Sequence, residues 1–515
     1  MKTFYITLFI LFQAASVALG QNKTVNVKTY GAIGDGVSND YPALKKAVAQ
    51  INAQGGGELY FPPGNYYLDV YHIPIRGGRG ARPDQAPSSV PQNPNDLKNG
   101  APPAPDQPAS SNRPNSPNRP AARAKSLTPD TDANIEEANL SDADISKTQE
   151  SNPEVTDLEF KNCDGLRIYG DQATIAVKGN IIREVTRINE RHTFSSIMAI
   201  TPIKLSNCKN VVVEGLTLDG NVDQMRKDPK VNESGGHLLF INKSENVQLK
   251  NLYIHHAQTD GIYIRNFSKD VTADNVVSSN NARQGMSIIQ LERGVFNNCK
   301  FINTGITEGP YGRHAPSGGV DIEPNRQTEQ VLDIQFNNCL FANNRGPQFI
   351  VSHPGTTNHV VLRSCKFVAD EQSNKLGILV SARDVLFEDC FFELGKANIY
   401  PARKPGTSSV FRNCIIRSSS SGIIAINADT ERSVVVDRCT LEYTGYNKIS
   451  SYFPYINMRN MVFTNNIIKV PSQYCKDSGS SGMVMNSMQV SGNRYLSEGR
   501  DMQQQLSVKG SRVRN

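Results

Sequence analysis

Short apolar runs separated by single polar or glycine positions fill the chain from about residue 155 onward, and they recur with a nearly constant spacing. The recurrence is clearest at five cysteines that follow one another at steps of 24 to 26 residues: Cys339, Cys365, Cys390, Cys414 and Cys439. Each has an apolar residue three positions before it and Phe, Ile or Leu two positions after it. We expect this column to continue at its two ends through Asn465, and through Cys299, Asn275, Asn251 and Gly215.

This period predicts a solenoid built from short parallel strands. No helical period separates the apolar runs, and one coil of this length cannot bury its own apolar side. Stacked coils place like residues above like, so Phe, Ile and Cys form internal columns. The chain is therefore expected to be all-β, a right-handed parallel β-helix with about 24–26 residues per coil. Nine cysteines cannot all pair, and their spacing favours small buried side chains.

A short helix is predicted near the beginning of the chain. Four apolar positions there fall at helical spacing: Leu44, Ala47, Val48 and Ile51. Asn39 and Asp40 can cap its start, and Gly55 can end it. Such a helix would close the end of a solenoid, which otherwise exposes its core.

The segment around that helix, residues 25–68, reads VNVKTYGAIGDGVSNDYPALKKAVAQINAQGGGELYFPPGNYYL. It is similar to the opening of the superfamily of pectate lyases, rhamnogalacturonases and epimerases. The resemblance implies the β-helix fold. It implies no single reaction, since hydrolases, lyases, epimerases and phage tailspikes share this opening.

Composition divides the chain into five parts. We expect a secretory signal peptide at residues 1–20, the cap and first coil at 21–76, and a proline-rich disordered insertion at 77–152. The β-helix then occupies 153–500, followed by a tail at 501–515. A cleaved signal peptide with no later long apolar run predicts a secreted protein, periplasmic or extracellular, without membrane insertion.

The charge pattern narrows the class of partner. The net charge of +6 is mild for 515 residues, and the basic residues are dispersed. This distribution disfavours nucleic acid and is compatible with a polysaccharide or oligosaccharide substrate, including an acidic one.

Two coils are longer than the rest, by about 12 and 15 residues, and the surplus must leave the solenoid as loops. The repeats place both loops, residues 219–236 and 304–318, at the same turn before the same strand. Since insertions on one face of a solenoid often carry function, we expect these loops to wall a groove for a glycan chain.

The strands that would floor this groove align residue by residue as Leu238–Phe240, Ile262–Arg265, Met286–Ile289, Val320–Glu323 and Phe349–Ser352. Alternation places their first and third positions inside. Five side chains are then expected to point outward: Tyr263, Arg265, Ser287, Asp321 and Glu323. The turns before the strands add His255, His256, Asp260, Arg283 and Gln284.

Carboxyl groups suggest hydrolysis, because cleavage of a glycosidic bond usually needs one acid and one base or nucleophile. Asp321 and Glu323 lie two residues apart, hence on one face of a strand. The alternative is that they are simply solvated or bind a cation.

A second carboxylate follows from a resemblance. Residues 258–262, Gln-Thr-Asp-Gly-Ile, resemble the Asn-Thr-Asp-Gly stretch of polygalacturonase-type hydrolases, which implies that Asp260 is catalytic. One coil later that family has two aspartates where this chain has Arg283 and Gln284, and its Gly-His-Gly and Arg-x-Lys stretches are missing. Polygalacturonase activity itself is therefore not expected, and Asp260 could alternatively cap a turn.

The remaining polar residues are predicted substrate contacts: His256, Tyr263, Arg265, Arg283, Gln284, Arg313 and His314. Arg283 could bind a carboxylate or sulfate, or stabilise the enolate-like intermediate of a lyase, or be an ordinary surface residue. The pair His255–His256 has no third ligand at a suitable spacing, so no metal site is predicted.

Three functions remain compatible with these residues. A glycoside hydrolase explains the carboxylates and requires no cofactor. A polysaccharide lyase or uronate epimerase explains the basic residues, with the carboxylates holding calcium. A non-catalytic glycan-binding protein explains the fold but leaves the clustered titratable groups without a role. We favour the hydrolase.

Overall fold

The computed structural model describes residues 24–69, 157–178, 182–187, 193–198, 200–224, 236–309, 312–373, 376–420, 433–445, 461–470, 489–497 and 500–501. The chain divides into two units, one formed by residues 1–74 with 146–515 and the other by residues 75–145. The signal peptide and the proline-rich insertion expected from the sequence lie outside the described residues, as does nearly all of the expected tail.

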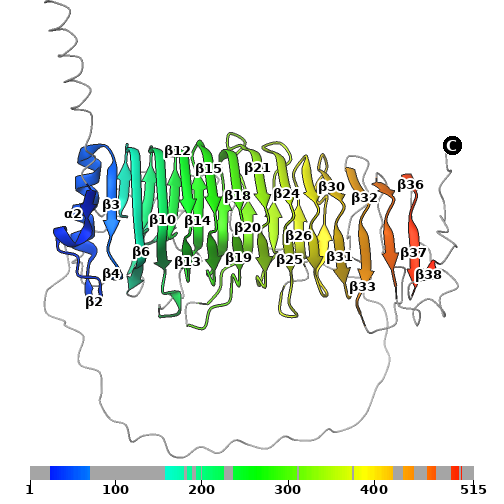
Figure 1. Ribbon diagram of the computed structural model, residues 1–515, viewed down its shortest axis with the longest axis horizontal. Helices are drawn as coiled ribbons and strands as arrows, with labels where there is room; N and C mark the ends of the chain where they lie inside the picture. The colour runs from blue at the N-terminus through cyan, green and yellow to red at the C-terminus, as the bar shows by residue number, and fades with distance from the viewer. Residues whose placement is uncertain are drawn as a thin grey trace, which may run out of the picture. The chain divides into compact units, whose positions relative to one another are not determined.

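The described residues form stacked coils of parallel strands, as predicted (Figure 1). A typical coil runs through β14 (Asp260–Arg265), β15 (Ser268–Asp274) and β16 (Val277–Ser279) before β17 (Gln284–Ile288) begins the next coil. The first strand of each coil joins a nine-stranded sheet, here sheet B, and the other two join a 27-stranded sheet, here sheet A. The chain is thus an all-β, right-handed parallel β-helix.

The strands of sheet B are β5 (Glu159–Lys161), β9 (Ile203–Ser206), β11 (Leu239–Asn242), β14, β17, β20 (Gly318–Ile322), β23 (Phe349–Val351), β26 (Leu376–Val380) and β29 (Asn398–Tyr400). The remaining strands of sheet A are β1 (Thr24–Asn26), β2 (Asp35–Asn39), β3 (Gly57–Phe61), β4 (Gly64–Asp69), β6 (Asp164–Lys178), β10 (Lys209–Asp219), β12 (Glu245–Lys250), β13 (Tyr253–His255), β18 (Leu291–Asn297), β19 (Lys300–Ile302), β21 (Val331–Asn337), β22 (Leu340–Ala342), β24 (Thr357–Arg363), β25 (Lys366–Val368), β27 (Val385–Glu388), β28 (Phe391–Glu393), β30 (Ser408–Arg412), β31 (Ile415–Ser418), β32 (Ser433–Asp437), β33 (Thr440–Tyr443), β34 (Met461–Thr464), β35 (Ile467–Lys469), β36 (Gln489–Ser491), β37 (Arg494–Ser497) and β38 (Arg500–Asp501). A separate antiparallel pair is formed by β7 (Ile182–Arg187) and β8 (Thr193–Met198).

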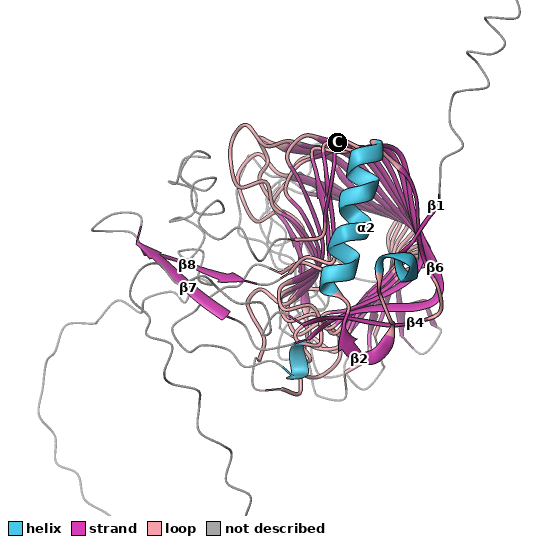
Figure 2. Cartoon of the chain, turned by 90° about the vertical axis from the view of Figure 1, so that its left-hand side faces the viewer, coloured by secondary structure: helices cyan, strands magenta, loops and turns pink. Residues whose placement is uncertain are grey.

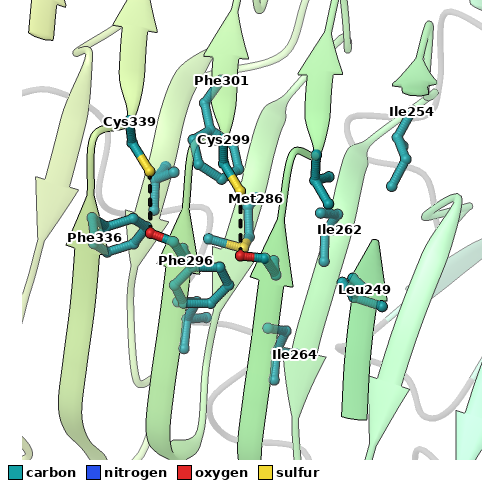
Figure 3. Close-up of a cluster of buried hydrophobic side chains, with 14 of the residues drawn as sticks. Leu249, Ile254, Ile262, Ile264, Met286, Phe296, Cys299, Phe301, Phe336 and Cys339 are labelled. Carbon is teal, nitrogen blue, oxygen red and sulfur yellow. Dashed lines mark hydrogen bonds between the residues drawn. The ribbon is translucent and has the colours of Figure 1, made fainter. Parts of the chain in front are cut away.

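The predicted cysteine column is buried. Its thiols donate to backbone carbonyl groups of the preceding coil, for example Cys339 Sγ to the carbonyl oxygen of Phe296 at 3.3 Å (Figure 3). Phenylalanine rings stack beside it, with Phe341 and Phe367 4.8 Å apart between ring centroids. The cysteines therefore act as core residues, as their spacing suggested.

The ends of that column were predicted one residue out of register. Asn465 and Asn275 have left-handed backbones and lie in the turn that precedes the buried position. The buried place next to Cys439 belongs to Asn466, whose Oδ1 accepts a hydrogen bond from the backbone N–H of Cys439 at 2.8 Å. Asparagine tolerates left-handed angles, so it recurs with the same period as the cysteine that follows it.

The predicted cap is present as α2 (Tyr41–Gln54), which lies at the end of the stack (Figure 2). It buries Leu44, Ala47, Val48 and Ile51 and ends at Gly55, whose φ is 72°. Two short 3-10 helices, η1 (Val27–Tyr30) and η2 (Val222–Gln224), complete the described helices. No helix within the described residues is long and apolar enough to cross a membrane.

Candidate functional site

The outward face of sheet B carries one column of side chains in direct register. Lys204 pairs with Phe240, Phe240 with Tyr263, and Tyr263 with Ser287. Ser287 then pairs with Asp321, the last polar member before Ile350. Because paired residues in parallel strands point the same way, these side chains stand beside one another across successive coils. The chain changes the residue in this column at every coil.

The first floor strand was predicted one residue out of register. Leu239, not Leu238, pairs with Ile262, so Leu239 and Ile241 face the core. Phe240 therefore faces outward. His237, two residues before Leu239, lies in the coil before Asp260 at the equivalent position. Leu238 is also buried, which is why the apolar pattern alone did not fix the register.

Arg283 connects two of the predicted carboxylates. Its Nη1 lies 3.3 Å from Asp260 Oδ2, and its Nη2 lies 3.4 Å from Glu323 Oε1. The side chains of Arg283 and Glu323 are both 12% exposed, whereas Asp260 is fully buried. Arg283 leaves the turn before β17, so it reaches one coil back to Asp260 and one coil forward to Glu323. The guanidinium therefore pairs with the fully buried carboxylate of Asp260 in the preceding coil and with the partly buried carboxylate of Glu323 in the following one.

Asp321 is held by an amide instead of a cation. Gln284 Nε2 donates to Asp321 Oδ2 at 2.9 Å, while Gln284 Oε1 accepts from the backbone N–H of Gly318 at 2.9 Å. A backbone N–H needs an acceptor, so the second bond fixes the orientation of the amide. Gln284 is itself fully buried, so its polar atoms serve Asp321 and Gly318.

The two aspartates have pKa values shifted in opposite directions. Burial raises the pKa of Asp321 to about 7; the charge of Asp260 adds to the rise, and Arg283 and Gln284 oppose it. Burial also acts to raise the pKa of Asp260, but Arg283 and a hydrogen bond from His237 outweigh it, and the pKa is lowered. Near neutral pH one carboxyl thus keeps its proton much of the time while the other is ionised.

Aromatic rings surround the ionised carboxylate. His237 Nδ1 lies 3.3 Å from Asp260 Oδ2, and the His237 ring stacks on Tyr263 with centroids 4.1 Å apart. Phe240 contacts Tyr263 edge-on at 5.1 Å. Burial is the main cause that raises the pKa of the Tyr263 hydroxyl, which disfavours its use as a base. His237 and Phe240 were missed from the sequence, although the corrected register of β11 would have placed both at this face.

The other predicted contacts lie further from this group. Arg265 Nη2 is 3.5 Å from Glu329 Oε1, an ion pair on the same face. Arg313 is exposed, and His314 is buried with its backbone N–H bonded to the carbonyl of Ala282 at 2.8 Å. The structure therefore brings Asp260, Arg283, Gln284, Asp321 and Glu323 together.

The two predicted loops contact each other in their described parts. Asp223, in the first loop, accepts hydrogen bonds at Oδ1 from the backbone N–H groups of Glu308 at 2.9 Å and Gly309 at 3.3 Å, both in the second loop. Both loops leave the coil at the turn before sheet B, so they rise along the same edge of that sheet. The two loops that were expected to form separate walls of a groove are thus hydrogen-bonded to each other at one edge of sheet B.

His255 and His256 lie beside a third potential metal ligand, Asp219, which the sequence did not reveal. Asp219, at the end of β10, is the register partner of His255 at the end of β13. One potential ligand atom from each of the three residues lies within 4.8 Å of the others, and this is the one such group of three among the described residues. His256 therefore faces Asp219 and Asp223 at the loop edge, not the floor of sheet B.

Calcium, which a lyase of this kind would place at the carboxylates, does not fit the residues present. Arg283 already supplies a positive charge between Asp260 and Glu323. Asp321 Oδ2 already accepts a hydrogen bond from the amide of Gln284. Calcium requires six to eight oxygen ligands in ionised or carbonyl form, and no cluster of that kind occurs here among the described residues.

Two family models match the chain. Residues 24–73 match the model described as rhamnogalacturonase A/epimerase, pectate lyase-like. Residues 191–392 match the model of the right-handed β-helix region. Together they cover the cap and the coils that carry the site.

Individual proteins resemble the chain over its cap or in its fold. Mannuronan C5-epimerase AlgE6 of Azotobacter vinelandii is 46% identical over 52 residues, which are 10% of this chain and 6% of that protein. The crystal structure of PfbA, a surface adhesin of Streptococcus pneumoniae, has a TM-score of 0.45 and 15% identity, covering 92% of this chain and 90% of that one. A family 28 exopolygalacturonase of Yersinia enterocolitica has a TM-score of 0.44 and 12% identity, covering 92% and 76%.

Proposed function

We propose that this chain, which matches the rhamnogalacturonase A/epimerase, pectate lyase-like model over its cap and the right-handed β-helix model over its coils, is a secreted enzyme that hydrolyses glycosidic bonds of a polysaccharide. Catalysis is assigned to the carboxyl groups beside Arg283 on the outward face of sheet B. The expected signal peptide supports secretion.

The opposite pKa shifts of Asp260 and Asp321 carry this proposal. Hydrolysis needs a carboxylic acid that still holds its proton and a second carboxylate that is ionised. Asp321, with a pKa of about 7, meets the first requirement, and Asp260, with a lowered pKa, meets the second. Asp321 acts as the general acid and Asp260 as the base or nucleophile.

The position of the acidic proton also supports the role of Asp321. Gln284 donates to Oδ2, so the proton of the neutral carboxyl resides on the other oxygen, Oδ1. Oδ1 is buried and has no hydrogen-bond partner among the described residues. Oδ1 is therefore the oxygen that would protonate the leaving glycosidic oxygen, once substrate binding exposes it. Arg283 keeps Asp260 ionised and positions Glu323, which together with Tyr263 is assigned to substrate contacts.

A panel of plant, algal and host glycans tests the reaction class. New reducing ends without ultraviolet absorbance of unsaturated uronates are expected. Asp321→Asn and Asp260→Asn should each lower the rate by about a thousandfold, since each removes one acid–base group. Asp437→Asn, the same change at a partly exposed position of β32 away from the site, should leave the rate unchanged. Full activity in both site variants would refute the assignment.

The pH profile supplies a second criterion. The rate should decline above about pH 7, where Asp321 loses its proton, and at low pH, where Asp260 gains one. A rate that keeps rising through pH 8 would exclude Asp321 as the acid.

A lyase or epimerase is the second candidate, because Arg283 and a protonated Asp321 could together neutralise the carboxylate of a uronate residue. New absorbance would indicate elimination, and a changed uronate composition without cleavage would indicate epimerisation. Binding without either change would favour a glycan-binding protein.

A further inference from the structure

A second cluster of titratable side chains lies at the loop edge, apart from the proposed catalytic group. His255 Nδ1 is 2.6 Å from His256 Nδ1 and 3.4 Å from Asp219 Oδ1. All three side chains are partly exposed, between 13% and 29%, so an ion from solvent can reach them. One potential ligand atom of each residue lies within 4.8 Å of the others, and the two imidazole nitrogens must move apart by about 0.7 Å for both to bind one tetrahedral ion.

His256 breaks an asparagine column. The residues at the equivalent position of the three following coils have left-handed backbones like His256 (φ 54°), and all of them are asparagine: Asn280, Asn303 and Asn343. Asparagine suits this conformation, and histidine adds nothing to the turn itself. Consecutive strand residues point to opposite faces, so the left-handed turn is what brings the His256 ring beside that of His255. The substitution of histidine in this column therefore calls for a role of its side chain.

An outer carboxylate orients the His256 ring. Asp223 Oδ2 lies 3.4 Å from His256 Nε2, which leaves Nδ1 facing His255 and Asp219. A carboxylate on the far nitrogen of an imidazole fixes its tautomer and strengthens the other nitrogen as a metal ligand. Asp223 is thus placed as the outer partner of a ligating histidine. This combination is the usual surrounding of a bound transition metal.

We propose that Asp219, His255 and His256 bind one divalent transition metal ion, zinc, through one carboxylate oxygen and the two Nδ1 atoms. Mixed nitrogen and oxygen donors select zinc over calcium or magnesium, which prefer oxygen alone. The third ligand comes from the neighbouring coil, and Asp223 extends the site to the second loop through its bonds to Glu308 and Gly309. The ion holds the loop edge beside sheet B, and its binding does not depend on the proposed hydrolysis.

Metal binding to the untagged full-length protein tests the proposal directly. After treatment with a chelator and its removal, Zn²⁺ should bind with a stoichiometry of one per chain in a calorimetric titration and raise the melting temperature. Co²⁺ should give the visible absorption of a nitrogen and oxygen site, without the strong near-ultraviolet band of thiolate ligation. Ca²⁺ should have neither effect.

The matched variants are His256→Asn and His359→Asn. The first restores the asparagine of the neighbouring coils, so it should fold, and it should bind Zn²⁺ at least a hundredfold more weakly. The second alters another left-handed histidine, whose Nδ1 lies 2.7 Å from Asp333 Oδ1, and it should bind like the wild type. No Zn²⁺ bound by the wild type, or equal affinity in His256→Asn, would overturn the site and identify the pair as a hydrogen bond between histidines.

Discussion

Two columns of side chains run across the coils, and they differ in how far the sequence repeats. Inside the solenoid, Cys339, Cys365 and Cys390 follow one another unchanged, each donating to a carbonyl group of the coil before it. On the outward face of sheet B, the paired residues change at every coil, from Phe240 through Tyr263, Ser287 and Asp321 to Ile350. One column repeats and the other varies.

The difference shows where a solenoid keeps its stability and where it gains chemistry. Identical residues stacked at a fixed spacing give every coil the same packing, so each interface contributes similarly to folding. A varied column gives each residue different neighbours. Asp260 lies beside a histidine and an arginine and has a lowered pKa, whereas Asp321 lies beside an amide and has a raised one.

The largest expected effect breaks the repeated column. Phe367 is fully buried between Phe341 and Phe392, with ring centroids 4.8 and 4.7 Å away. Phe367→Ala should lower the free energy of unfolding by about 3–5 kcal/mol, because it leaves a cavity in a stack that cannot collapse. Denaturant titration measures the loss.

Phe391→Ala is the matched control, since Phe391 points outward beneath the cations of Lys366 and Arg417. It should cost about 1 kcal/mol or less. Equal losses at Phe367 and Phe391 would show that the inner column is not the source of stability.

The sequence predicted the repeated column and only part of the varied one. Period alone revealed the coil length, the buried cysteines and the place of the loops, because packing imposes the same demand at every coil. It could not separate a turn asparagine from the buried residue after it, nor Leu238 from Leu239, since both members of each pair suit the pattern. Asp260, Arg283 and Asp321 were named as candidates, but the double contact of Arg283 depends on side-chain reach that no period encodes. His237 was missed because β11 was predicted one residue out of register. The pairing of Asp219 with His255 was hidden because the long coil separates these residues in the sequence.

The second prediction concerns the free energy of unfolding that is lost because the varied column buries Asp321. The folded protein raises the pKa of Asp321 from 3.8 to about 7, so it binds this proton more tightly than the unfolded chain. The contribution of Asp321 to stability is then greatest below about pH 4 and declines as the pH rises to about 7. Asp321→Asn removes the ionised group and should raise the free energy of unfolding at pH 8 by up to about 4 kcal/mol, a gain that vanishes near pH 4. Denaturant titrations at both pH values measure it.

Asp437→Asn should show the opposite sign. A hydrogen bond from Asn465, with another from Thr464, lowers the pKa of Asp437 in the folded protein despite some desolvation. Its carboxylate therefore stabilises the fold above the unfolded pKa, and the variant should be slightly less stable at pH 8 and unchanged at low pH. If Asp321→Asn destabilises at pH 8 as Asp437→Asn does, Asp321 is not a strained buried acid.

The smallest effect tests whether neighbouring coils tune one another. His237 stacks on Tyr263, and its Nδ1 contacts Asp260. The variant His237→Phe separates these two roles, because phenylalanine keeps the aromatic ring but lacks the nitrogen. Without the bond from His237 the pKa of Asp260 rises, so the acid limb of the pH–rate profile should move to higher pH. The rate at pH 5 should drop a few-fold while the rate at pH 7 changes less. His237→Ala should shift the limb similarly and also raise KM, since the face of Tyr263 is uncovered. An acid limb that His237→Phe leaves in place would mean that Arg283 alone keeps Asp260 ionised, and that the contact between these coils contributes packing without tuning the acid–base pair.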